Sequence, residues 1–175
     1  MTHYNRSMRE VRQAGQDPSF LLKALSEAAG ELQRSFHGLR RADLLRRGEG
    51  FDDCWCLLSI AVHLRDVEED AQEQFELMLS RREPDLHHVD LDRVPIEPEY
   101  LNEDEEEALA DFRQLRRETA YLLWDLTPKA WERGGHHPYR GRITVLEFAR
   151  DLYQHDLEHL WQVRRMLDRL AATRR

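Results

Sequence analysis

Apolar side chains recur at every third or fourth position along four stretches of the chain, which is the spacing of amphipathic α-helices. The first stretch opens at Asp17-Pro18, a capping residue followed by a proline at the first helical position, and Gly38 is its expected end. The second begins at Asp52 or Asp53, either of which can cap a helix. The two apolar rows are Leu21, Leu25, Ala28, Leu32 and Phe36, and Ile60, His63, Val67, Ala71, Phe75 and Met78.

Residues 82–101 form a linker in which three prolines interrupt the helical pattern. This linker is longer than a turn between adjacent antiparallel helices requires, so we expect a crossover connection between the second and third helices or a lid. Asn102 is expected to cap the third helix, with Glu105 closing a capping box. The apolar row of this helix is Ala108, Phe112, Leu115, Thr119, Leu122 and Leu126.

The last part of the chain combines a short turn, a loop and the fourth helix. A proline after a threonine predicts a helical turn over 127–131, and the glycine-rich stretch 134–141 predicts a loop. Thr144 begins the fourth helix, because Glu147 completes a capping box with it. The apolar row that follows is Phe148, Leu152, His155, His159, Val163, Met166 and Leu170.

Four such helices predict an all-α four-helix bundle. The chain has 175 residues, of which 41% are hydrophobic, and this is enough for one domain with its own core. We assign residues 17–175 to this domain and residues 1–16 to a polar N-terminal extension.

Composition limits the partners and the location of the protein. A formal net charge of −8 argues against a nucleic-acid partner, which usually requires a basic face. No apolar run approaches the ~20 residues of a membrane span, and the polar start is not a signal peptide, so we expect a cytoplasmic protein without a membrane partner. Cys54 and Cys56 flank Trp55 in the predicted second helix, where their side chains diverge, so we expect reduced thiols.

Three histidines occupy positions in otherwise apolar rows: His63 in the second helix, and His155 and His159 in the fourth. The spacing of four residues places the last two imidazoles on one helix face, about 6 Å apart along the axis. A buried imidazole costs roughly 1–3 kcal/mol for each unsatisfied nitrogen, and one shared divalent ion would satisfy all three rings. The alternative is that each histidine has its own hydrogen-bond partner in the core.

Carboxylates close to these histidines in sequence are candidates for orienting a ring or transferring a proton. The zincin motif would place a glutamate directly after the first histidine of 155–159, and Asp156 stands there instead, so metallopeptidase chemistry is not supported. Asp66, Asp156 and Glu158 are the candidate catalytic bases, with solvated helix carboxylates as the alternative for each. The other paired histidines are expected in exposed loops, namely His87, His88, His136 and His137.

These residues resemble those of the DinB/YfiT-like superfamily. The resemblance extends over roughly residues 18–172 and rests on Trp55, His63-Leu64-Arg65-Asp66, Trp131-Glu132-Arg133-Gly134, His137-Pro138, Gly141, Thr144-Val145-Leu146-Glu147 and His155-Asp156-Leu157-Glu158-His159-Leu160-Trp161-Gln162. It implies an up-up-down-down four-helix bundle with a crossover linker. It also implies frequent homodimers and a metal site at one end of the bundle, with His63, His155 and His159 as ligands.

The resemblance also implies a range of functions. Family members with assigned chemistry include thiol S-transferases and a thiol-dependent maleylpyruvate isomerase. We therefore expect a metal-dependent transferase or hydrolase for a small-molecule substrate, with zinc or nickel as the ion and a low-molecular-weight thiol as a candidate second cofactor. Two alternatives are a non-catalytic bundle in which the metal joins two helices or senses stress, and a helical interaction module without a metal.

Overall fold

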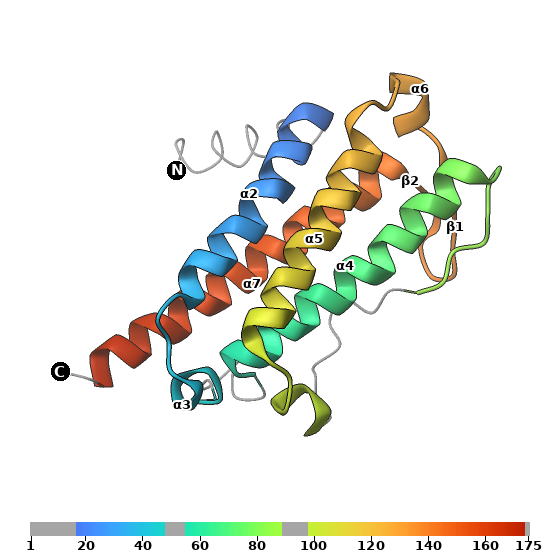
Figure 1. Cartoon of the computed structure of the whole chain (residues 1–175). Coiled ribbons are helices and arrows are strands. Elements are labelled where there is room, and N and C mark those ends of the chain that lie inside the picture. The colour runs from blue at the N-terminus through green and yellow to red at the C-terminus, as the bar shows by residue number, and fades with distance from the viewer. Residues whose placement is uncertain (1–16, 48–54, 89–97, 174–175) are drawn as a thin grey trace, which may run out of the picture.

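The computed structural model describes residues 17–47, 55–88 and 98–173, which form a bundle of four long helices (Figure 1). These helices are α2 (Pro18–Phe36), α4 (Leu57–Ser80), α5 (Glu105–Trp124) and α7 (Val145–Thr173). The shorter elements are α3 (Arg41–Leu44), the 3₁₀ turn η2 (Pro98–Leu101), α6 (Pro128–Trp131), and the strands β1 (Gly134–His137) and β2 (Gly141–Thr144). The predicted all-α four-helix bundle is confirmed. The predicted extension 1–16 lies outside the described residues.

Contacts at one end of the bundle establish the direction of each helix. Arg41, at the start of α3, donates from its guanidinium to the carbonyl oxygens of Leu101 and Glu103, both at 2.7 Å. Arg46 Nη1 lies 3.0 Å from the hydroxyl oxygen of Thr173 in the last turn of α7. The end of α2, the start of α5 and the end of α7 therefore meet here, and Figure 1 shows the start of α4 at the same end.

The long helices consequently do not follow the order that the family resemblance implies. α4 and α5 run parallel to each other, while α2 and α7 run in the opposite direction (Figure 1). The up-up-down-down expectation is therefore wrong, because the two parallel neighbours are the second and third helices. α4 ends at one end of the bundle and α5 begins at the other, so the chain crosses the length of the bundle between them, which confirms the predicted crossover (Figure 1).

Local signals explain most helix ends. The Asp17 carboxylate accepts from the Ser19 N–H at 2.9 Å and caps α2. This helix stops at Phe36, ahead of Gly38, whose φ of +75° suits glycine. Thr144 and Glu147 form the predicted capping box at the start of α7. The Thr144 N–H donates to Glu147 Oε2 at 2.8 Å, and the Glu147 N–H donates to Thr144 Oγ1 at 3.1 Å.

Two helix starts differ from the prediction. α4 begins at Leu57, and its cap is Cys56, whose N–H donates to the Ser59 hydroxyl at 3.0 Å. Trp55 therefore precedes the helix; Asp52, Asp53 and Cys54, which also entered the prediction, lie outside the described residues. α5 begins at Glu105 rather than after Asn102, because the Asp104 carboxylate accepts from two N–H groups of the first turn.

The predicted loop over 134–141 is wrong, since β1 and β2 pair there as an antiparallel hairpin. The start of the linker joins this hairpin: the His136 N–H donates to the Pro84 carbonyl at 2.8 Å, and the Leu86 N–H donates to the His136 carbonyl at 3.0 Å. A Cβ on Gly134 would lie 2.1 Å from the Ile143 carbonyl oxygen. The glycines thus permit close strand approach rather than marking a loop.

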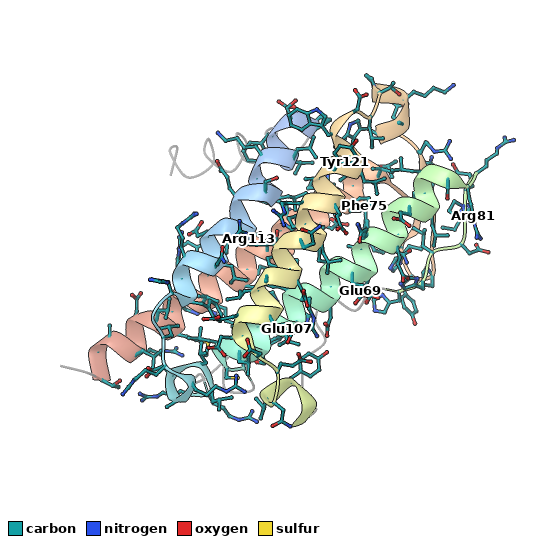
Figure 2. The ribbon with its side chains drawn as sticks, in the orientation of Figure 1. Glu69, Phe75, Arg81, Glu107, Arg113 and Tyr121 are labelled. Atoms are coloured by element: carbon teal, nitrogen blue, oxygen red, sulfur yellow. The ribbon has the colours of Figure 1, made fainter. Side chains whose placement is uncertain are left out.

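The bundle core consists of two apolar clusters separated by a polar layer. One cluster surrounds the start of α4 and the end of α7, and the other surrounds the end of α4 and the start of α7. Phe75 belongs to the second cluster, whereas Tyr121 lies on the outer surface of α5 and is 86% exposed (Figure 2). The buried polar residues between the clusters include His63, Glu68, Arg116, Thr119, His155, Asp156 and His159.

Candidate metal centre

The polar layer contains the histidine triad, which consists of His63, His155 and His159. His63 lies in the second turn of α4, and the other two lie one turn apart on α7. Their exposed fractions are only 3%, 5% and 7%. Each replaces an apolar residue in the row that faces the core, so burial of the row brings the three rings together from two helices.

The ring nitrogens of the triad converge. His155 Nε2 lies 3.0 Å from His63 Nε2 and 3.0 Å from His159 Nε2, and one nitrogen from each ring lies within 4.8 Å of the others. An imidazole nitrogen has either one lone pair or one hydrogen, so His155 Nε2 cannot make a well-directed hydrogen bond to both neighbours.

A divalent cation fits this donor set. Neighbouring nitrogens on a tetrahedral zinc ion are about 3.3 Å apart when the Zn–N distances are about 2.0–2.1 Å. The two separations from His155 Nε2, both 3.0 Å, are close to that value, and three imidazoles leave a fourth position for water or substrate.

Gln162 supports one ring of the triad from behind. Its Oε1 lies 2.8 Å from His159 Nδ1, so Nδ1 carries the hydrogen and donates it. His159 Nε2 is then left with its lone pair directed toward the other two rings. This role of Gln162 was not predicted, although its position three residues after His159 on the same helix face is a signal that the sequence contains.

Trp55 covers the triad on one side. Its ring packs edge-to-face on His63 and His159, with centroid separations of 5.2 and 5.1 Å. Trp55 is itself only 8% exposed. The indole therefore shields two imidazoles from solvent and restricts access to their nitrogens.

Comparison with known proteins agrees with this fold. The family model of the DinB superfamily matches residues 24–163. The chain belongs to the DinB superfamily. Among solved structures, YfiT from Bacillus subtilis resembles it with a TM-score of 0.79 at 19% identity, over 88% of this chain and 87% of that chain. YfiT is described as a probable metal-dependent hydrolase with an unusual four-helix bundle topology. No match was found among curated proteins.

The three predicted bases of this DinB-superfamily protein lie in different surroundings. Asp66 is partly exposed, and it accepts from the Tyr100 hydroxyl at 2.8 Å and from Arg65 Nε at 2.9 Å. Glu158 lies on the exposed face of α7. Asp156 is 2% exposed and contacts Arg116 rather than solvent. Their catalytic roles stay predictions, but Asp66 is the one that is both ordered by neighbours and accessible.

Beside the triad lies a charged group, the Arg116 cluster, which consists of Glu68 on α4, Arg116 on α5 and Asp156 on α7. Arg116 donates to both Asp156 oxygens, from Nη1 to Oδ2 at 2.5 Å and from Nη2 to Oδ1 at 3.1 Å. Arg116 Nη2 also lies 2.7 Å from Glu68 Oε2. Nη1 donates in addition to the Leu25 carbonyl oxygen on α2, at 2.9 Å. One guanidinium thus reaches all four long helices.

Burial dominates the protonation of the Arg116 cluster. Loss of solvent raises the pKa of Asp156, and the negative charge of Glu68 adds to this effect, although Arg116 opposes it. Burial alone would lower the pKa of Arg116, but the two carboxylates together hold the pKa above its ordinary value. Arg116 therefore stays charged inside the bundle.

The apolar row predicted for the third helix explains why this cluster was missed. Leu115 and Leu122 are only half-buried, while Arg116 and Leu123 are buried. The true row runs Ala108, Phe112, Arg116, Thr119 and Leu123, with steps of four and three. Both rows have helical spacing, so periodicity alone does not select the one that contains Arg116.

The other histidines among the described residues do not join the triad. His88 and His137 lie near each other and near Tyr139, with ring centroids separated by 5.5 Å for the two histidines. His87 and His136 are exposed, as predicted. His136 and His137 lie in β1, not in a loop.

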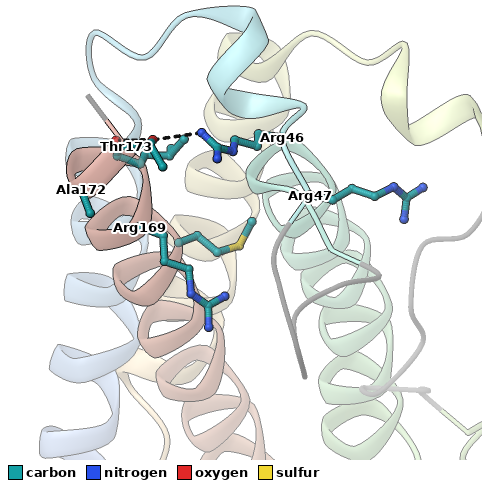
Figure 3. Close-up of a pocket in the computed structure, with 7 residues that line it drawn as sticks. Arg46, Arg47, Arg169, Ala172 and Thr173 are labelled. Carbon is teal, nitrogen blue, oxygen red and sulfur yellow. Dashed lines mark hydrogen bonds between the residues drawn. The ribbon is translucent and has the colours of Figure 1, made fainter. Parts of the chain in front are cut away.

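A pocket of about 190 Å³ lies between the segment after α3 and the last turns of α7 (Figure 3). Arg46, Arg47 and Arg169 line it, and none of the triad histidines does. Figure 3 shows the three guanidinium groups pointing in different directions.

None of the described helices combines the length and the apolar character that crossing a membrane requires.

Proposed function

We propose that this DinB-superfamily protein is a divalent-metal-dependent enzyme that acts on a small molecule by hydrolysis. The observation that supports the proposal is the convergence of three buried imidazole nitrogens from α4 and α7. The description of YfiT as a probable metal-dependent hydrolase supports the same chemistry. Zinc and nickel are the ions that we favour, because both accept imidazole ligands.

Each neighbouring residue has a distinct part in this proposal. A divalent ion held by three neutral imidazoles retains its full charge and lowers the pKa of a bound water or thiol. Gln162 keeps His159 in the tautomer that presents Nε2. Trp55 restricts access of solvent to the site. Asp66, ordered by Tyr100, is the carboxylate that we propose as the proton acceptor.

Elemental analysis and a hydrolysis assay test the proposal together. Protein stripped with a chelator is reloaded with zinc, nickel, cobalt or manganese and assayed on a panel of esters, amides and lactones. We expect stoichiometric ion in the wild-type protein and in His37→Ala, an exposed histidine, and none in His155→Ala. A wild-type protein that takes up no ion contradicts the metal site, and an ion-loaded protein without turnover contradicts the enzymatic role.

Thiol transfer is the finer alternative within the enzymatic class. The same ion that lowers the pKa of water also lowers that of a bound thiol. Assays with a low-molecular-weight thiol and an electrophilic acceptor distinguish the two reactions, since a hydrolase turns over substrate without added thiol.

The near-complete burial of the triad favours one further candidate, an ion that joins α4 and α7 without catalysis. In that case chelation lowers the melting temperature and no substrate reacts. The homodimer and the cytoplasmic location expected from the sequence stay predictions.

A further inference from the structure

The Arg116 cluster joins the two helices that carry the histidine triad. Glu68 follows His63 by five residues on α4, about 7.5 Å along the helix axis. Asp156 follows His155 directly on α7. Arg116 comes from α5, which carries no histidine of the triad, and contacts both carboxylates at 2.5–3.1 Å.

The cluster is poorly suited to stabilising the fold. Arg116 is 2% exposed, Glu68 is 0% exposed and Asp156 is 2% exposed, so three charges have lost their solvent. Within the described part of the chain, Arg116 Nε and both Glu68 oxygens make no well-directed hydrogen bond, and the Glu68 contact is an ion pair only. A buried ion cluster of this kind contributes little net stability compared with apolar side chains of similar volume.

The same contacts are well suited to fixing directions. The two parallel bonds from Arg116 to Asp156 require the planar fork of the guanidinium to meet the carboxylate in one orientation. A rotation of α7 by one residue would turn Asp156 away from Arg116, and it would turn His155 away from His63 by the same ~100°. The apolar contacts of the core are less directional, so they tolerate such rotations more readily.

We propose that Arg116 is a positioning residue for the histidine triad, which it holds in place by bridging Glu68 on α4 and Asp156 on α7. The proposal rests on the proposed function for its relevance to metal binding. The convergence of the imidazoles in the metal-free protein, however, is a property of the chain alone.

The deciding variant replaces the whole cluster by apolar residues, Glu68→Leu, Arg116→Met and Asp156→Leu together. This triple variant is expected to fold, because no buried charge is left unpaired. Thr119→Val is the matched control, since it removes a buried hydroxyl of the same layer that has no hydrogen-bond partner among the described residues. Arg116→Lys is a second variant, which keeps the charge and loses the planar fork.

Two measurements decide the outcome. Crystal structures of the metal-free variants give the separations of the triad nitrogens, and titration with Co²⁺ against a chelator gives affinity, with the cobalt absorption spectrum reporting coordination geometry. In the triple variant we expect nitrogens spread beyond the present 4.8 Å, at least about tenfold weaker Co²⁺ binding and an altered spectrum. Thr119→Val should match the wild-type protein in all three respects.

Unchanged nitrogen separations and an unchanged spectrum in the triple variant would overturn the proposal. If the triple variant does not fold, Arg116→Lys decides the outcome. Wild-type nitrogen separations and wild-type Co²⁺ affinity in Arg116→Lys would show that the charge of Arg116 matters and its planar geometry does not, which also overturns the proposal. If the wild-type protein binds no Co²⁺, the proposed function fails, while the metal-free structures still decide the positioning role.

Discussion

The histidine triad and the Arg116 cluster lie in the same layer of the bundle, and they differ in whether their buried charges and polar groups face opposite or like groups. The Arg116 cluster is compensated internally, because a guanidinium meets two carboxylates and a backbone carbonyl. The triad presents like groups to one another, three ring nitrogens within 4.8 Å. Internal compensation is typical of groups that hold a structure, whereas convergence of like donors is typical of a site for an external cation.

The first way to test this contrast is to remove one member of the triad. In His63→Gln we expect ion content to fall from about one per chain to background, because two imidazoles hold a divalent ion far more weakly than three. The free energy of unfolding of metal-free His63→Gln, measured in urea, should differ from that of the wild-type protein much less than that of Arg116→Met does. If elemental analysis finds about one ion per chain in His63→Gln, the triad is not the ion site and the contrast with the Arg116 cluster fails.

Removing one member of the Arg116 cluster should lower the stability of the metal-free protein. Arg116→Met leaves two carboxylates buried without their cation, so we expect the free energy of unfolding to fall by about 3–5 kcal/mol. Urea denaturation of the metal-free protein measures it. Arg140→Met, which loses only the exposed ion pair with Asp151, is the control and should cost no more than about 1 kcal/mol. Equal losses in both variants would contradict a special role for the buried cluster.

A smaller effect is expected from the residue that supports the triad. Gln162→Leu removes the acceptor of the His159 Nδ1 hydrogen and should weaken metal binding by about 10–100-fold. Gln162→Glu restores an acceptor and should recover most of the affinity. Competition with a chelating dye measures both, and equal affinities for the Leu variant and the wild-type protein would exclude this role.

The smallest effect is expected from the capping box of α7, a polar contact outside the buried polar layer. Thr144→Ala breaks the capping box of α7 and should lower the free energy of unfolding by about 1 kcal/mol at neutral pH, measured in urea.

The Thr144 N–H holds the pKa of Glu147 below its ordinary value of 4.5, so the stability from this carboxylate is present at neutral pH. It is lost as pH falls through the lowered pKa. The free energy of unfolding of Glu147→Gln, measured in urea, should therefore approach that of the wild-type protein as the pH falls. A difference between the two proteins that does not change with pH would contradict this.

Several features could be predicted because their cause is local. The Asp17-Pro18 start of α2 and the Thr144 capping box depend on bonds between residues within three positions of each other. His63, His155 and His159 could be identified as candidates because each interrupts an apolar row, and helical periodicity directs such a row to the core.

Other local predictions failed where two signals competed. Asp104 and Asn102 are both capping residues, and the sequence does not say which one the first turn will use. The glycines of 134–141 are compatible with a loop or with strands in close approach. The close approach of Ile143 to Gly134, and of Pro84, which is distant in sequence, to Gly135, selects the strands.

The sequence by itself determined the four long helices, the buried faces of α2, α4 and α7, and the three imidazoles that face inward, because periodicity and capping act within a few residues. Only the tertiary structure decided that α4 and α5 run parallel, that Arg116 faces the core, and that the imidazoles meet at one point. Those outcomes depend on how four helices are rotated and shifted against one another. That arrangement depends on packing and polar contacts between residues 40 to 92 positions apart, as in Arg116–Asp156 and His63–His155. A pattern within a few residues of sequence does not predict such contacts.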